Sequence, residues 1–189
     1  PDSLIGNIFF TDTRFVNLDK AYGTDSIKVI AERNENQQSI FVNSEAFTLD
    51  WKGEYKLTET GDQVMQSIKR YYNLPYNIKD TSFSPQDWLM NILLKPSAPL
   101  VLQFVPELKG SDTLAAHIAF NSIENDLDIQ MHAPLIKYAD QSITNLDVTA
   151  ATEADQLKYS VNADRLGSQS FRLYKTSIDG RLAENALFS

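Results

Sequence analysis

Apolar and polar residues alternate along most of this chain, and this period of two constrains the fold more than any other feature. Between residues 47 and 57 the large apolar side chains all occupy odd positions: Phe47, Leu49, Trp51, Tyr55 and Leu57. A strand with one buried face has this pattern, because successive side chains point to opposite faces of the sheet. No helix separates most of the predicted strands, which favours antiparallel pairing. The chain is therefore predicted to be mainly β, with an antiparallel meander sheet.

The alternation predicts eleven strands. We expect them over about residues 4–10, 13–18, 26–33, 38–45, 47–57, 88–94, 113–121, 126–132, 142–151, 156–164 and 169–182. The fifth and sixth are separated by the longest interval in this series. The segment before the sixth resembles a helix start at Ser84-Pro85, but Trp88, Met90 and Ile92 alternate as a strand does, so a strand is the prediction.

Apolar matching also predicts the register of three hairpins. Pairing Ala31 with Ile40, Ile118 with Ile129, or Ala150 with Tyr159 places an apolar face against an apolar face, whereas a slip of one residue opposes apolar to polar. A shift of 119 residues superimposes the first hairpin on the third. The sequence thus predicts one repeat-built domain over 1–189, with repeat units at about 1–60 and 120–189.

Helices are expected to interrupt the sheet in two places. Apolar residues have helical spacing between Asp62 and Asn73, and Leu74-Pro75 ends the pattern because proline lacks an N–H group. We therefore predict one inserted helix at about 62–73. A short second helix at about 97–104, ending before Pro106, is the further expectation.

Composition excludes several classes of function. The formal net charge is −8, so the chain is a poor candidate for binding nucleic-acid phosphates. It contains no cysteine, which removes disulfides, thiol nucleophiles and cysteine-ligated zinc. No apolar run reaches the 18 or so residues that a membrane-spanning helix needs.

Two polar pairs are candidates for a metal site or a catalytic site. His117 and His132 are diagonal neighbours on the predicted outer face, as metal ligands can be, but no enclosing carboxylates accompany them. Asp126 and Asp128 share one strand face, as two acidic residues of a glycosidase or a cation site can, although a solvated face beside a turn explains them better. No nucleophile elbow or phosphate loop is present. We expect no enzyme activity, metal or cofactor.

The apolar face of the sheet has two interpretations. It is either a closed core or the lining of a groove for lipid acyl chains, and the sequence leaves sandwich, barrel and open groove as alternatives. The candidate groove residues are large and apolar, and they come from strands across the chain: Phe47, Leu49, Trp51, Tyr55, Leu57, Trp88, Met90, Ile92, Leu127, Ile129, Met131, Tyr159 and Val161.

Several segments resemble one family. These are residues 17–19 with 25–31, residues 51–59 before the predicted helix, the run at 104–108, and the strand at 145–150. Their order along the chain is similar to that in the TamB/AsmA-like envelope proteins of Gram-negative bacteria. The resemblance spans most of the chain, and it is one of pattern rather than of an invariant motif.

The resemblance implies a fold and a role. Members are anchored in the inner membrane, extend across the periplasm, and curl their sheet into a trough called a β-taco with an apolar interior. They are linked to phospholipid movement towards the outer membrane and to the assembly of outer-membrane β-barrel proteins. This chain would then be an internal fragment with a lipid-facing lining and no catalytic residues. The alternative is a closed-core scaffold that binds an envelope assembly partner through an edge strand.

Overall fold

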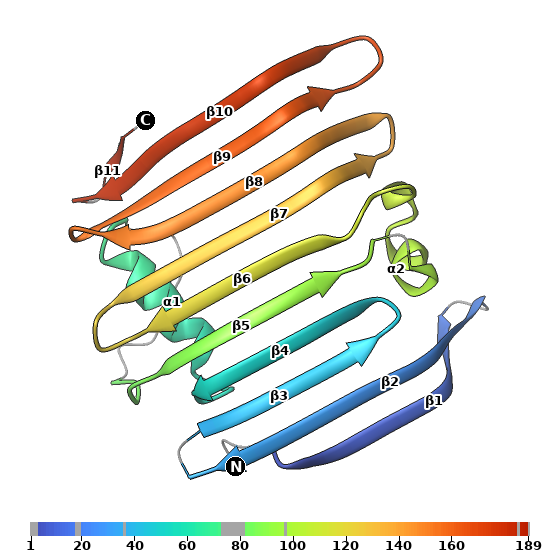
Figure 1. Ribbon diagram of the computed structural model, residues 1–189, viewed down its shortest axis with the longest axis horizontal. Helices are drawn as coiled ribbons and strands as arrows, with labels where there is room; N and C mark the ends of the chain where they lie inside the picture. Colours follow the sequence, from blue (N-terminus) through green and yellow to red (C-terminus); the bar gives the residue numbers. More distant parts are fainter. Residues whose placement is uncertain are drawn as a thin grey trace.

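A single antiparallel sheet dominates the computed structural model, which describes residues 4–17, 20–35, 37–72, 82–96, 98–184 and 186–188. Within these residues the sheet has eleven strands, and each strand pairs with the next one along the chain (Figure 1). The strands are β1 (Gly6–Asn17), β2 (Lys20–Asn34), β3 (Gln37–Ser44), β4 (Phe47–Glu54), β5 (Asp87–Leu94), β6 (Leu114–Asn121), β7 (Asp126–Tyr138), β8 (Gln141–Glu153), β9 (Gln156–Gly167), β10 (Arg172–Ala183) and β11 (Ala186–Phe188).

The predicted hairpin registers are confirmed. Ala31 pairs with Ile40, Ile118 with Ile129, and Ala150 with Tyr159. The mainly β, antiparallel meander is confirmed with them. Burial of one face fixes such a register, because a slip of one residue would turn every side chain to the opposite face.

Several predicted strand bounds were wrong. Strand β2 begins at Lys20 rather than at about 26, and β7 continues to Tyr138 rather than ending at about 132. The strands expected at about 4–10 and 13–18 are one strand, β1, in which pairing is interrupted only at Asp12. Asp12 has a φ of 49°, a backbone conformation that interrupts an extended strand without ending it. The strand expected at 47–57 ends at Glu54, because Lys56 accepts backbone hydrogen bonds from residues 59 and 60 and thereby starts a helical turn.

The inserted helix is confirmed, with shifted bounds. Helix α1 runs from Thr60 to Lys69, whereas the sequence predicts about 62–73, the last residue of which lies outside the described residues. The helix tightens at its end: the backbone N–H of Arg70 donates to the carbonyl of Ser67, three residues back. This tightening ends α1 earlier than the apolar spacing predicts.

A second short helix is also present. Helix α2 covers Pro99–Phe104, and a single 3-10 turn, η1, follows at Pro106–Leu108. Proline is favoured in the first turn of a helix, where its missing N–H costs nothing. Further along a helix the missing N–H removes a backbone hydrogen bond, so Pro106 ends α2. The predicted helix at about 97–104 is therefore confirmed with a later start: Ala98 is extended, and residue 97 lies outside the described residues.

The sheet curls into a trough, as predicted. Helix α2 follows β5 in the chain, yet it lies beside β2, three strands away in the sheet. A flat sheet would keep α2 near its own strand. Figure 1 shows α1 at one end of the strands and α2 at the opposite end. We call the face of the sheet that α1 packs against the inner face.

Candidate functional site

Four aromatic side chains form a buried cluster on the inner face. Trp51 stacks on Tyr55 with ring centroids 4.0 Å apart, and it meets Trp88 edge-on at 5.7 Å. Trp88 in turn contacts Phe120 at 5.5 Å. We call these four residues the aromatic cluster. Each of them is at most 9% exposed, so the cluster is closed to solvent.

Helix α1 belongs to the cover over this cluster. Val64 and Ile68 of α1 pack against the buried core that contains the cluster, and Tyr71, just after the helix, is part of that core. Leu127 and Leu157 extend the same core into β7 and β9. The inner face is therefore a closed core at this end of the strands.

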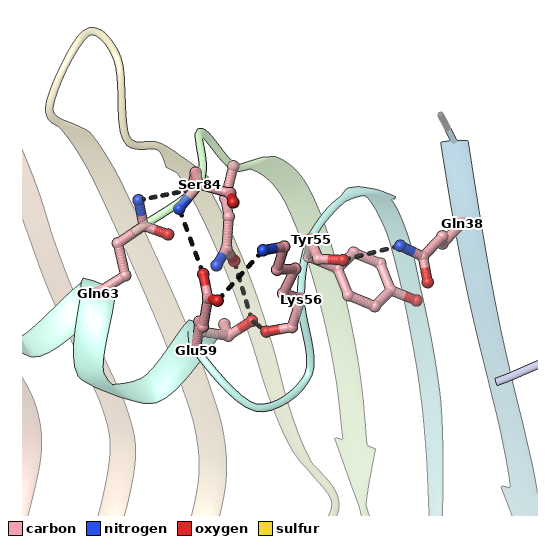
Figure 2. Close-up of polar contacts among 8 residues, drawn as sticks. Gln38, Tyr55, Lys56, Glu59, Gln63 and Ser84 are labelled. Atoms are coloured by element: carbon pink, nitrogen blue, oxygen red, sulfur yellow. Dashed lines mark hydrogen bonds and ion pairs between the residues drawn. The ribbon is translucent and has the colours of Figure 1, made fainter. Parts of the chain in front are cut away.

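Polar contacts hold the start of α1 (Figure 2). The amide nitrogen of Gln63 donates to the carbonyl of Ser84 at 3.1 Å, and the backbone N–H of Ser84 donates to Glu59 at 3.2 Å. Lys56 forms an ion pair with the same Glu59 at 3.2 Å. The helix thus begins against the segment that leads into β5.

Another set of hydrogen bonds holds the end of α1. Asn125, in the turn between β6 and β7, accepts a hydrogen bond from the Ser67 hydroxyl and donates one to the Tyr71 hydroxyl. Asn125 has a φ of 53°, which asparagine tolerates better than most residues. This one side chain therefore joins the helix end to the sheet.

Burial changes the pKa of the Tyr55 hydroxyl in the cluster. Desolvation raises the pKa of Tyr55 from 10.0 to about 12, because the charged phenolate is disfavoured away from water. The backbone carbonyl of Tyr55 accepts a hydrogen bond from Gln38 at 2.8 Å, whereas its hydroxyl has no partner among the described residues. Tyr55 thus remains neutral, and its hydroxyl is unsatisfied.

Beside the covered cluster runs a row of half-buried apolar residues. Its members are consecutive cross-strand partners from β3 to β9, and we call it the apolar strip: Val42, Leu49, Ile92, Ala116, Met131, Val148 and Val161. Six strand spacings of about 4.8 Å make the strip roughly 29 Å long. It crosses the strands from β3 to β9.

A cavity lies behind the middle of the strip, on the outer face of the sheet. It has a volume of about 450 Å³ and is lined by three consecutive residues from each of four strands: 91–93, 115–117, 130–132 and 147–149. The central residue of each triplet belongs to the apolar strip. The other eight lining residues, which include His117, Gln130, His132 and Asp147, alternate with the strip residues along their strands and so belong to the outer face. The cavity is therefore a hollow of the outer face, behind the strip, from β5 to β8.

The residues predicted for the groove fall into three groups: those in or against the covered core, those in the apolar strip, and those outside both. Trp51, Tyr55, Trp88 and Leu127 are buried in the covered core, and Met90 and Ile129 are half-buried against it. Leu49, Ile92, Met131 and Val161 lie in the apolar strip. Phe47 and Tyr159 are half-buried on flanking rows, and Leu57 is 39% exposed in the turn before α1.

Three strip residues were missed from the sequence. Val42, Ala116 and Val148 have smaller side chains than nearly all of the groove candidates, although Val161 was among those candidates. The predicted hairpin registers already placed them opposite Val29, Met131 and Val161. Register, rather than side-chain size, is the signal that finds the strip.

The outer face carries the two histidines. A ring nitrogen of His117 lies 2.8 Å from the Asn91 side-chain oxygen, and one of His132 lies 2.7 Å from Asp147. Within the described ranges no group of three or more histidine, cysteine or acidic residues is placed to hold a metal ion. Asp128 accepts a hydrogen bond from Gln130 at 3.0 Å, on the same exposed face.

Comparisons with known proteins do not assign the chain to a family. No protein-family model, curated protein or solved structure gave a match. The resemblance to TamB/AsmA-like proteins therefore stays a prediction. None of the described helices is long and apolar enough to cross a membrane.

Proposed function

We propose that the inner face binds lipid acyl chains and that the protein acts without catalysis, as a segment of a phospholipid conduit. The apolar strip carries this proposal. Seven half-buried apolar residues follow one another across seven strands, and no strip residue is polar. A row of this kind offers an extended chain continuous apolar contact.

Partition supplies the energy for such binding. Each buried CH₂ group contributes about 0.8 kcal/mol, so a chain of more than ten groups needs no polar recognition site. The head group would remain in water at the open side of the trough. Acyl chains would leave one membrane, lie along the strip, and pass on by the same weak contacts.

The family resemblance suggests the cellular location and process in which this activity would operate. We propose a periplasmic segment of a longer protein anchored in the inner membrane, which contributes to phospholipid transport towards the outer membrane or to assembly of outer-membrane β-barrel proteins. The curl of the sheet into a trough supports this assignment, since the resemblance implies a trough.

A charge on the strip tests the proposal. Met131→Asp places a carboxylate in the middle of the strip, and Gln130→Asp places the same group on the outer face of the same strand as a matched control. Native mass spectrometry of gently purified protein, with identification of extracted lipid, is the measurement. We expect phospholipid with the wild type and the control, and at least a tenfold loss with Met131→Asp.

Folding must be separated from binding in this test. Ala116→Phe fills the strip without adding charge, so it should also lower lipid occupancy, and circular dichroism checks that each variant retains its sheet. A wild-type chain that carries no lipid, or equal occupancy in all variants, contradicts the proposal.

A second function is favoured by the edge strand β1. Among the described strands it pairs with β2 only, and Ile8, Phe9 and Phe10 are 43%, 62% and 46% exposed along it. An open edge with large apolar side chains is suited to pairing with a strand of an envelope assembly partner. A photo-reactive residue at Phe9 should cross-link to one envelope protein in cells, and one at exposed Phe104 should not. Equal labelling at both positions excludes the edge as the interface.

A further inference from the structure

The helix over the aromatic cluster fits its site poorly. The buried residues of α1 are Thr60, Gln63 and Ser67, all of them polar, whereas the apolar residues Val64 and Ile68 are only partly buried. A helix that is a permanent part of a core buries its apolar stripe. Here the most buried positions are polar, so α1 contributes less apolar contact than its sequence allows.

Unsatisfied polar atoms gather at the same place. Seven buried side-chain nitrogen or oxygen atoms lack a partner among the described residues, and five of them belong to α1, to the aromatic cluster or to the residue that binds Thr60. These five are Trp51 Nε1, Tyr55 OH, Gln63 Oε1, Gln86 Nε2 and Trp88 Nε1. Buried polar groups are normally paired, and an unpaired one is costly. The covered state therefore carries a cost that uncovering would relieve.

Other features make α1 easy to release. It has ten residues, fewer than an isolated helix needs to be stable, and Glu59 at its start makes no side-chain capping bond. A cavity of about 220 Å³ lies beside it, lined in part by Gln63, Ser67 and Phe120. Side-chain hydrogen bonds near its two ends hold it, and within the part of the chain that the structure describes no backbone hydrogen bond joins it to a strand.

We propose that α1 is a displaceable occupant of the inner face, and that the aromatic cluster beneath it is a concealed second site for a lipid acyl chain. This inference rests on the proposed acyl-chain function. The acyl chain takes the place of the apolar side of α1 against Trp51, Tyr55 and Trp88. The indole N–H groups and the phenol then reach ester oxygens of the lipid or water.

The composition of the chain allows displacement of α1 to be measured with one introduced thiol and with tryptophan fluorescence. There is no cysteine, so Ser67→Cys gives a single thiol at a position that is 5% exposed and faces Asn125. Ser111→Cys is the matched control, since Ser111 is 4% exposed and hydrogen-bonded to Lys137, away from α1. Both tryptophans of the chain belong to the cluster, so intrinsic fluorescence reports on that cluster alone.

The experiment adds phospholipid with brominated acyl chains in detergent micelles to each variant. Quenching of tryptophan fluorescence measures binding near the cluster, and the rate of reaction with a maleimide measures exposure of the thiol. We expect quenching in both variants. We expect the maleimide rate to rise at least tenfold with lipid for Ser67→Cys and to stay unchanged for Ser111→Cys.

Each of the other outcomes contradicts either the displacement of α1 or the proposed function. Quenching without a faster reaction at Ser67→Cys overturns the displacement of α1 and leaves the groove intact. A faster reaction at both thiols means general unfolding and also overturns it. No quenching and no bound lipid contradicts the proposed function itself. If Ser67→Cys fails to fold, Thr60→Cys, 8% exposed in the wild type, replaces it.

Discussion

The inner face consists of two regions that share strands but differ in cover. At one end lies the aromatic cluster, in which Trp51 and Trp88 are 9% and 5% exposed, within the core against which α1 packs. Beside it runs the apolar strip, where Met131 and its neighbours stay half-buried. Alternation is the same in both regions. What differs is the residue size and the presence of a helix, so one pattern yields both a core and an open surface.

Truncating the cluster should have the largest effect. Trp88→Ala removes a buried indole that contacts two other rings, and we expect the free energy of unfolding to fall by about 4 kcal/mol. Met131→Ala in the strip should cost only about 1 kcal/mol, because the side chain is already half in water. Urea unfolding measures both. Equal losses would mean that the two regions do not differ.

Gly53 should be the most sensitive backbone position at the covered end. Its φ is 134°, and an added Cβ would lie 2.2 Å from the carbonyl oxygen of Asp87. Gly53→Ala should therefore cost about 3 kcal/mol through strain and collision. Gly23, where an added Cβ meets nothing within 4 Å, is the control, and Gly23→Ala should change stability by less than about 1 kcal/mol. A similar loss at both positions contradicts the close approach of β4 and β5.

Removing the unsatisfied hydroxyl of Tyr55 should raise stability, whereas the substitutions above lower it. Tyr55→Phe removes a buried oxygen that lacks a partner, so we expect stability to rise by up to about 1 kcal/mol at pH 7. The pKa of this tyrosine is near 12 in the folded chain and 10.0 ordinarily. Its contribution to stability is constant below pH 10 and falls from pH 10 to 12, as the unfolded chain ionises first.

Urea unfolding at pH 7, 10 and 11.5 checks this dependence. The difference between wild type and Tyr55→Phe should widen as the pH rises, while the other tyrosines and the lysines titrate equally in both proteins. A constant difference over this range would show that Tyr55 is not desolvated in the folded chain.

The exposed pair on the outer face should matter least. His132 and Asp147 lie 2.7 Å apart, but their side chains are 50% and 54% exposed. Such pairs contribute roughly 0–1 kcal/mol because water and salt screen them. Asp147→Ala should shift the urea midpoint only slightly and leave lipid occupancy unchanged. A loss of more than about 2 kcal/mol would assign the outer face a structural role.

Most of the sheet was predictable because its register depends on local matching. The pairs Val29–Val42 and Phe120–Leu127 follow from alternation alone, and both are present. The single strand β1 was not predictable, since the positive φ of Asp12 leaves no mark on the apolar pattern. Tyr55 illustrates the same limit: its odd position predicts the correct face, but its burial depends on tertiary packing.

The groove was only partly predictable, for a related reason. Large side chains such as Trp51 and Trp88 are prominent in the sequence as groove candidates, yet both are buried in the closed core. Small residues such as Ala116 leave space and so line the strip. Which apolar residues remain open depends on where α1 packs, and the alternation of the strands does not contain that information.

The most direct test of the account is photo-cross-linking with a diazirine-labelled fatty acid, followed by mapping of the labelled peptides to single residues. Alternation gives an internal control, because Met131 and Val148 lie in the strip while their neighbours Gln130 and Thr149 face outward. The account predicts labels on Met131 and Val148 and few on Gln130 and Thr149. Labels spread evenly over both sets, or confined to the outer residues, would contradict an acyl-chain groove on the inner face.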